Sequence, residues 1–238
     1  MGRRSKKLSR EEQMEVEEWI YQNNTEEKRL SDTMTISVKC KTENQKALVN
    51  AIKEKEVIIC SGPAGTGKTY LACAEALKLI KRYAKYKKIV IVKSVTTLKN
   101  EEIGFLKGGL REKMEPFMFS FVHNFEKLVG QAITSRLREL KTIEELPIAY
   151  MRGINLDRSI IIIDEAQNIS RENIRTIMTR LGKDSKMIFL GDERQQDSKG
   201  GNGLTFLMDH FQEIDEIGCV QFNKSDVVRN PLIAKIER

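Results

Sequence analysis

The sequence contains few of the residues from which metal centres are usually built. Its 238 residues include four cysteines and two histidines. None of the cysteines follows a CxxC or other metal-ligand spacing, and the two histidines lie far apart in the chain. The cysteines are Cys40, Cys60, Cys73 and Cys219. We therefore expect no zinc site, and we interpret the cysteines as free thiols in a reducing compartment.

Long apolar runs are also missing. No run reaches the length of a membrane helix, and the amino terminus is charged where a signal peptide needs an apolar core. Internal repeats and low-complexity segments are absent as well. We therefore expect a cytoplasmic protein without a membrane partner.

Aromatic residues make up only 6% of the chain, which leaves few candidates for stacking on nucleic-acid bases. The net charge of +7 and the pI near 9.1 favour polyanionic partners, but a basic excess is as often a solubility device. Basic stretches occur at residues 3–7 and 107–111, and Phe105 lies beside the second. Composition therefore allows a nucleic-acid partner without requiring one.

From residue 42 onward, buried strands alternate with amphipathic helices. The predicted strands are residues 56–62, 87–94, 159–164, 186–192 and 218–223, and the predicted helices between and before them include 42–55, 68–83, 171–182 and 203–214. Strands that are apolar throughout and interleaved with helices are typical of a parallel sheet covered on both faces. The pattern therefore predicts an α/β fold.

The domain boundaries follow from breaks in this pattern. Residues 1–41 comprise a basic arm, an amphipathic helix with Val16, Trp19 and Ile20 on its apolar face, and a polar connection with room for a short strand. Residues 42–238 form the main domain. Within it, residues from about 95 to 158 interrupt the alternation, and we predict a largely helical insertion there.

The segment "GPAGTGKT", residues 62–69, matches the phosphate-binding motif G-x-x-x-x-G-K-[ST] in full. A predicted strand precedes it and a predicted helix follows, as the motif requires. The glycines let backbone amides approach a phosphate at the positive end of the helix. Lys68 would then reach the outer phosphates, and the Thr69 hydroxyl would hold Mg²⁺.

A second polar feature follows the run of isoleucines at residues 160–163. Two adjacent acids at the end of a buried strand are costly unless a cation or a reacting group needs them. Asp164 is therefore the candidate partner of the metal, and Glu165 is the candidate that polarises the attacking water. An ordinary strand followed by an acidic helix cap is the alternative interpretation.

Two further residues are candidates for the chemistry. Gln195 follows another buried strand and could contact the terminal phosphate or its water, while its acidic neighbours are as readily surface residues. Arg229, in "DVVRNPL", could stabilise transition-state charge from its own subunit or from a neighbour, although a surface ion pair would explain a single arginine equally well.

Several motifs together resemble one family. "NQKALVNAI", "GPAGTGKTYLA", "GFLKGGLREKMEPF", "PIAYMRGINLDRSIIIIDEAQN", "GD…Q" and "DVVRN" occur in the order and spacing of PhoH-like ATPases, which are similar to the motor core of superfamily 1 helicases. The resemblance runs from about residue 44 to residue 236. It implies a RecA-like P-loop NTPase fold.

The resemblance also implies roles for particular residues. Glu165, Gln195 and Arg229 are the expected catalytic residues, and Thr69 and Asp164 the expected metal ligands. The predicted cofactor-binding residues are Gly62, Pro63, Ala64, Gly65, Thr66, Gly67, Lys68, Thr69, Tyr70 and Gln45. Gln45 is similar in position to a glutamine that reads adenine in related helicases, but it could equally be the capping-box partner of Thr42.

The implied cofactors are ATP and Mg²⁺, and the implied polymer is RNA or single-stranded DNA. We also expect a homo-oligomer, such as a hexameric ring in which Arg229 acts across the interface. A protein-remodelling or scaffolding ATPase without a nucleic-acid substrate is the main alternative. A small-molecule kinase ranks last, because adjacent acids at a strand end favour the activation of water.

Overall fold

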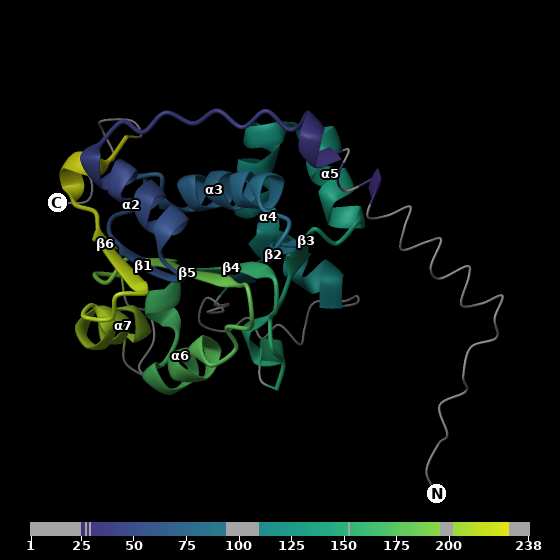
Figure 1. The fold of residues 1–238 in the computed structure, drawn as a ribbon. Helices are drawn as coiled ribbons and strands as arrows, with labels where there is room; N and C mark the ends of the chain where they lie inside the picture. Colours follow the sequence, from purple (N-terminus) through teal and green to yellow (C-terminus); the bar gives the residue numbers. More distant parts are fainter. Residues whose placement is uncertain are drawn as a thin grey trace, which may run out of the picture.

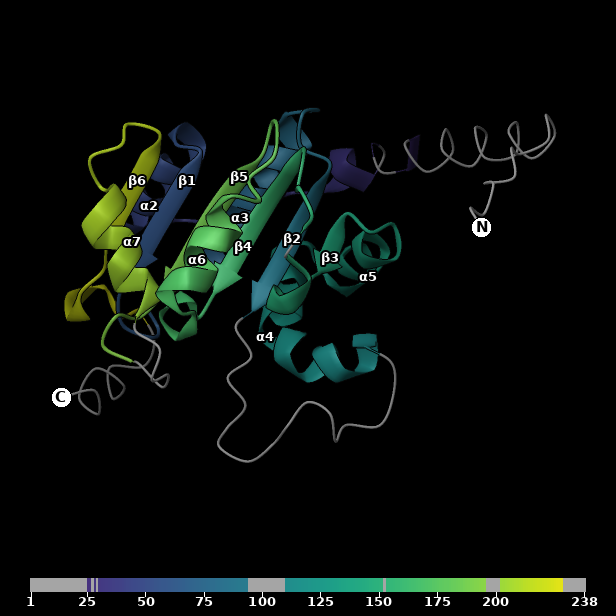
Figure 2. The same ribbon diagram turned by 90° about the horizontal axis from the view of Figure 1, so that it is seen from below.

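The computed structural model describes residues 25, 26, 28, 30–93, 110–151, 153–195 and 202–228, except for the side chains of residues 110–117 and 149. In these ranges, six parallel strands form one sheet in the order β3-β2-β4-β5-β1-β6 (Figure 2). The strands are β1 (Val57–Ser61), β2 (Lys88–Lys93), β3 (Ile143–Glu145), β4 (Ser159–Asp164), β5 (Lys186–Gly191) and β6 (Ile217–Gln221).

Five of these strands coincide with the predicted buried runs, and β4 has the predicted bounds. Their Val and Ile side chains favour the extended backbone and pack well on a pleated surface. The four isoleucines of β4 have no exposed surface. Because a parallel sheet is buried on both faces, the sequence shows continuous apolar runs here rather than alternation.

The helices lie on both faces of the sheet (Figure 1). On one side are α2 (Glu43–Glu54), α3 (Lys68–Arg82), α4 (Leu110–Val129) and α5 (Gln131–Glu139), and on the other are α6 (Arg171–Met178) and α7 (Gly203–Phe211). Buried apolar side chains form a separate cluster on each side. These observations confirm the predicted α/β class. Within the described ranges, none of the helices combines the length and apolar composition needed to cross a membrane.

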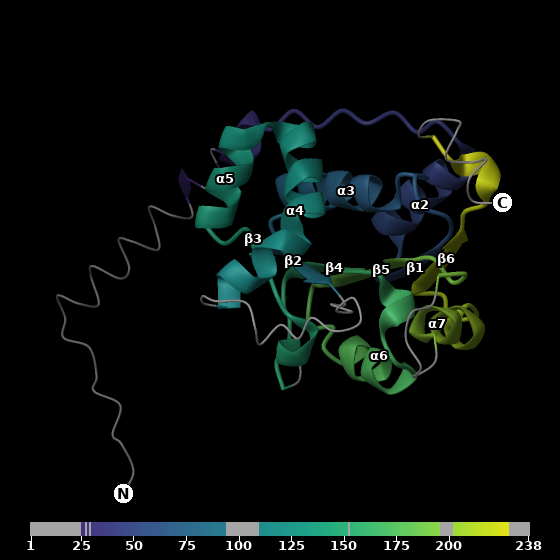
Figure 3. The same cartoon turned by 180° about the vertical axis from the view of Figure 1, so that it is seen from behind.

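The insertion between β2 and β4 differs in one respect from the prediction. It contains α4, which lies beside α3, and α5, which lies on the other side of α4 (Figure 3). It also contains the strand β3 and the short 3₁₀ helix η2 (Ile148–Met151). β3, which extends the sheet at its edge, was not predicted from the sequence. Two of its three residues are glutamates that pair with basic side chains, so it lacks the apolar run that marks the other strands.

The connection before α2 contains helical residues up to Thr33 and then an extended segment, residues 34–41, which forms no strand. The sequence allowed for a short strand there. Instead, Ile36, Val38 and Cys40 pack against the apolar cluster on the α2–α3 side of the sheet. An extended segment lying on helices therefore explains the alternating pattern. The predicted basic arm and amphipathic helix fall outside the described residues.

The strand order brings the ends of β1, β4 and β5 together. β5 lies between β1 and β4, and Ser61 is in register with Gly191. The backbone N–H of Gly62 donates to the carbonyl of Gly191 at 3.1 Å. Because parallel strands all end at the same edge of a sheet, the segments that follow these three strands must share one surface.

Candidate functional site

The loop at residues 62–69 joins β1 to α3 in a conformation that depends on its glycines. Gly62 has φ +148°, and a Cβ added to it would lie 2.5 Å from the Cβ of Phe222. Gly67 has φ +87° and immediately precedes the first residue of α3. Glycine adopts these backbone angles without steric cost. The loop therefore passes close under the end of β6 and directs the amino end of α3 toward the strand tips.

The side chain of Lys68 folds back onto the start of this loop. Its ammonium donates to the carbonyl oxygens of Gly62 and Pro63, at 2.6 and 2.7 Å. Burial lowers the pKa of Lys68, while the nearby carboxylates, including Asp192 and Asp164, act in the opposite direction. A partly buried cation whose hydrogen-bond partners are neutral carbonyls is suited to an incoming anion.

Gln45 holds the loop from the side of α2 and is 4% exposed. Its Nε2 donates to the carbonyl of Thr66 at 2.9 Å, and its Oε1 accepts from the backbone N–H of Lys41 at 2.6 Å. The Thr42 hydroxyl caps α2 as predicted, by accepting from the Gln45 backbone N–H. The capping-box alternative is therefore only half right, because the Gln45 side chain reaches Lys41 and Thr66 instead of the cap residue.

The two acids after the isoleucines differ in their surroundings. Asp164 ends β4, and burial raises its pKa to about 6, an effect to which the charge of Glu165 adds. Glu165 has φ +55°, in the left-handed region that non-glycine residues rarely adopt. Such conformations persist where surrounding contacts hold them, and they concentrate at functional sites.

The contacts that hold Glu165 come largely from Gln167, which is 1% exposed. The Gln167 Nε2 donates to the Glu165 carboxylate at 2.7 Å, and its Oε1 accepts from the backbone N–H of Asp192 at 3.1 Å. A Cβ on Gly191 would lie 2.3 Å from this Oε1. One buried amide thus connects the acid after β4 to the segment after β5.

The segment after β5 is ordered by hydrogen bonds. The Asp192 carboxylate accepts from the backbone N–H of Arg194 at 3.1 Å, and the Asp192 carbonyl accepts from the backbone N–H of Gln195 at 3.1 Å. The backbone N–H of Glu193 donates to the Ser61 hydroxyl at 3.3 Å. These contacts fix the turn that carries Gln195.

A cavity of about 470 Å³ lies between the loop and the strand ends, and we call it the tip site. Its lining consists of Ala64, Gly65, Gly67, Lys68, Thr69, Tyr70, Asn124, Lys127, Asp164, Glu165, Gly191, Asp192, Gln195 and Val228. Nine of the predicted site residues are in this set. Gly62, Pro63 and Thr66 are not in the lining but form hydrogen bonds within the loop. Gln45 is also outside the lining and supports the loop through Thr66.

The polar groups of the tip site suit a particular kind of metal ion. Among the described residues, no group of three or more His, Cys, Asp or Glu side chains could hold a metal. The Thr69 hydroxyl and the Asp164 carboxylate supply oxygen ligands only. Mg²⁺ prefers oxygen and usually takes one or two protein ligands together with waters and substrate phosphates. The residues present therefore fit Mg²⁺ bound with a nucleotide, and not a metal caged by the protein alone.

Comparison with known proteins places these features in a family. The sequence matches the family of PhoH-like proteins over residues 37–238. The chain belongs to the PhoH-like protein family. The match confirms the resemblance noted in the sequence, and the parallel sheet with its phosphate loop confirms the RecA-like P-loop NTPase fold.

This PhoH-like chain is 37% identical to a PhoH-like protein of Bacillus subtilis (strain 168), over 97% of this chain and 71% of the relative. It is 36% identical to a PhoH-like protein of Mycobacterium tuberculosis (strain ATCC 25618 / H37Rv), over 84% and 57%. It is 32% identical to protein PhoH of Escherichia coli (strain K12), over 83% and 56%. The chain thus spans little more than half the length of the latter two relatives.

Solved structures with a similar fold include a large terminase from a thermophilic bacteriophage and the Pif1 helicase from Candida albicans. The terminase is 13% identical with a TM-score of 0.46, and the match covers 82% of this chain and 49% of that chain. The helicase is 14% identical with a TM-score of 0.39, over 79% and 40%. Similarity at this level carries no information on activity.

The structure adds site residues of this PhoH-like chain that the sequence analysis missed. Asn124 and Lys127 reach the tip site from α4, within the insertion. They lie three positions apart and so share one face of the helix. That spacing is common in any amphipathic helix, and only the packing of α4 against α3 identifies this face as part of the site.

Arg229 lies outside the described residues, but the residue before it does not. Val228 lines the tip site, and its backbone N–H donates to the carbonyl of Gly65 at 3.1 Å. A further bond, from the Asn44 amide to the Asp226 carboxylate at 2.7 Å, ties this carboxy-terminal segment to α2. The chain therefore continues toward Arg229 from the rim of the site.

Proposed function

We propose that this PhoH-like chain binds ATP with Mg²⁺ and hydrolyses it in the tip site. The observation that carries the proposal is a single cavity that contains the loop residues Lys68 and Thr69 on one side and Asp164, Glu165 and Gln195 on the other. A nucleotide-binding loop alone would serve a switch or a kinase. Asp164, Glu165 and Gln195 would supply the groups that bind the metal and position the attacking water.

The loop side would bind the phosphates. Backbone amides at the start of α3 and the Lys68 ammonium provide positive potential for the phosphate oxygens. Thr69 and Asp164 would hold Mg²⁺, which when bound neutralises developing charge on the phosphates. Asp164 is desolvated beside another acid, so a bound cation would relieve an unfavourable charge as well as position the ligand.

The β4 side would orient and deprotonate the attacking water. The Glu165 carboxylate lines the cavity, and Gln167 fixes its orientation by donating to one oxygen. The other oxygen is then free to accept a proton from water. Gln195, also in the lining, would hold the same water or the terminal phosphate. A positioned base of this kind contributes about 10²–10⁴-fold in rate.

Arg229 would complete the site with a cation for the transition state. Its neighbour Val228 is held against the phosphate loop, which supports delivery of Arg229 to the rim. The arginine would act in its own subunit or, in a homo-oligomeric ring such as a hexamer, in the next one. Cations supplied in this way contribute about 10³–10⁵-fold where they operate.

We further propose that turnover is coupled to RNA or single-stranded DNA. The net charge of +7 and the likeness of the motifs to helicase motor cores support this coupling. A remodelling or scaffolding ATPase without a polynucleotide, or a small-molecule kinase, would use the same phosphate loop. These alternatives differ in what stimulates turnover and in where the phosphate goes.

The test measures phosphate release from ATP by the parent chain and by Glu165→Gln. Without its base, the variant should bind ATP with Mg²⁺ as the parent does but release phosphate about 10²–10⁴-fold more slowly. Glu172→Gln, which alters an exposed acid on α6, is the matched control and should keep parent turnover. Equal turnover in Glu165→Gln and the parent would remove the assignment of the base.

The same assay with RNA or single-stranded DNA, over a series of salt concentrations, tests the coupling. Stimulation should fade with salt by roughly 0.7 in the logarithmic slope for each phosphate neutralised on a single strand. Absence of stimulation by any polynucleotide would favour the remodelling ATPase. Transfer of phosphate to a metabolite instead of water would favour the kinase.

A further inference from the structure

A second cavity lies at the β2–β3 edge of the sheet, away from the tip site. Its volume is about 450 Å³, and we call it the edge groove. Apolar side chains from β2, from the segment after β3 and from the segment before β4 form its floor, and these are Val90, Leu146, Pro147, Ile154 and Leu156. Of the described helices of this face, α7 lies toward the β6 end of the sheet and α6 over its middle (Figure 2). Val90 and Leu156 are already buried in the core. Leu146 and Pro147 are half-buried and Ile154 is 37% exposed, so these three form the apolar surface that is open to a partner.

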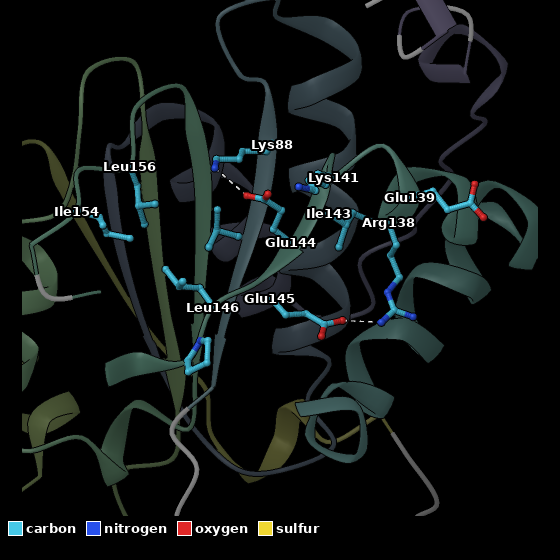
Figure 4. A pocket seen from close by; sticks show the side chains of 12 residues that line it. Lys88, Arg138, Glu139, Lys141, Ile143, Glu144, Glu145, Leu146, Ile154 and Leu156 are labelled. Carbon is cyan, nitrogen blue, oxygen red and sulfur yellow. Dashed lines mark hydrogen bonds and ion pairs between the residues drawn. The ribbon is translucent and has the colours of Figure 1, made fainter. Parts of the chain in front are cut away.

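The charged side chains around this floor largely neutralise one another. Lys88 pairs with Glu144, and Arg138 pairs with Glu145, each at 2.7 Å. Figure 4 shows these two pairs beside Leu146 and its apolar neighbours. A groove whose charges are already paired is poorly suited to a phosphate or a metal ion. It is suited to an amphipathic segment that brings an apolar face.

The described chain begins at the rim of the edge groove. The Arg136 guanidinium on α5 binds the Glu26 carboxylate at 2.6 and 2.7 Å, and it also binds Glu139 at 2.7 Å. Glu139 lines the groove. One guanidinium thus connects the first described helical turn to the groove. Trp19 and Ile20 lie only seven and six residues before Glu26, so this anchor is close in sequence to the apolar residues of the segment.

The segment before this anchor has the pattern that the groove requires. In residues 9–24, Val16, Trp19 and Ile20 recur at the spacing of one helical face. The same residues include five glutamates and one arginine. On the groove rim, Lys141 is exposed and has no acidic partner among the described residues. The segment therefore complements the groove by its apolar face, and Lys141 offers a rim cation to one of its glutamates.

We infer that residues 9–24 dock as an amphipathic helix in the edge groove of their own chain, with Trp19 against the apolar floor. The segment ends next to the anchored turn that contains Glu26, and this closeness in the chain makes its effective concentration at the groove high. The inference does not depend on ATP hydrolysis, because the groove and the tip site share no lining residue.

Trp19 is the single tryptophan of the chain, so its fluorescence reports on this segment alone. In the full-length chain, its emission should lie at shorter wavelength than in denaturant, and acrylamide should quench it several-fold less. Ile154→Glu places a charge at a floor position that is 37% exposed and should move the emission toward the denatured value. Ile214→Glu, at an apolar position that is 43% exposed and outside the groove, is the matched control and should leave the emission unchanged.

Thermal unfolding of both variants checks that they fold. Lys141→Glu, an exposed rim substitution, provides a second variant that should increase quenching without altering the floor. Parent emission equal to that in denaturant, or emission that neither variant changes, would overturn the inference. A shift that depends on protein concentration would overturn it too, because the segment would then occupy the groove of another copy.

Discussion

The tip site and the edge groove both gather charged side chains, but the charges are balanced in different ways. In the groove, acids and bases pair directly, as Lys88 does with Glu144. In the tip site, Lys68 donates to backbone carbonyls, and no salt bridge between it and Asp164 or Glu165 occurs in the described part of the chain. Burial acts against both charges, because it lowers the pKa of Lys68 and raises that of Asp164 to about 6.

Paired charges in the edge groove and unpaired charges in the tip site suit different roles. Paired charges at a sheet edge satisfy one another and keep the edge soluble, which is a structural role. When charges of both signs share a cavity without pairing, their burial lowers the stability of the fold. A ligand that places a negative group near the cation and a positive ion near the acids offsets this loss. A phosphate chain with its cation is such a ligand. Four substitutions test this contrast.

The largest effect is expected for Lys68→Ala. The variant loses a partly buried cation that binds phosphate, and charged hydrogen bonds contribute about 1.5–3 kcal/mol each. Affinity for ATP should fall about 100-fold or more, measured as loss of the thermal shift that ATP with Mg²⁺ produces. Lys53→Ala, an exposed change on α2, is the control. Parent-like binding by Lys68→Ala would show that the loop does not hold the phosphates.

The next effect is expected for Gln167→Ala, which removes the amide between Glu165 and the Asp192 backbone. Turnover should fall roughly 10–100-fold with little change in the affinity for ATP, since the base keeps its charge but loses its orientation. Single-turnover kinetics and nucleotide titration separate the two quantities. Gln221→Ala, at an exposed amide with its own hydrogen bond, should change neither. A loss confined to affinity would contradict the positioning role.

Lys186→Met tests how much a buried cation outside the tip site reduces the free energy of unfolding. Lys186 begins β5 at the opposite end from the tip site and is 4% exposed, and burial lowers its pKa to about 8. The unfolded chain holds this proton up to about pH 10.4, so the parent gains stability as pH rises from 8 toward that value. The variant should be more stable by about 1–3 kcal/mol at pH 7.

Denaturant titrations at several pH values measure this gain, which should shrink between pH 8 and about pH 10.4. Lys183→Met, at an exposed position nearby, should give no comparable gain. A loss of stability in Lys186→Met at pH 7 would mean that this lysine has a favourable partner, and the contrast between buried and paired charges would weaken.

The smallest effect is expected for Glu144→Gln in the edge groove. The Lys88 and Glu144 side chains are 35% and 32% exposed, and pairs of this kind contribute about 0–1 kcal/mol. Chemical denaturation should therefore show a small change that salt reduces further. A loss above about 2 kcal/mol would indicate that the groove charges do more than solubilise an edge.

Much of the fold could be predicted from the sequence because its signals are local. Short apolar runs located five strands, and the four isoleucines before Asp164 gave the bounds of β4. The Thr42 cap located the start of α2. β3 escaped prediction because its short, acidic sequence becomes a strand only by pairing with β2 and with the cations beside it.

By itself, the sequence determined the five apolar strands, the phosphate-binding loop and the presence of two acids at the end of β4, since each is encoded within a few consecutive residues. Only the tertiary structure decided which distant groups meet there. Gln45 lies 21 residues from Thr66, and Gln167 lies 25 from Asp192, yet each pair forms a buried hydrogen bond behind the lining of the tip site. Asn124 and Lys127 join the cavity through the packing of α4. Such contacts depend on strand order and helix packing, which no local pattern encodes.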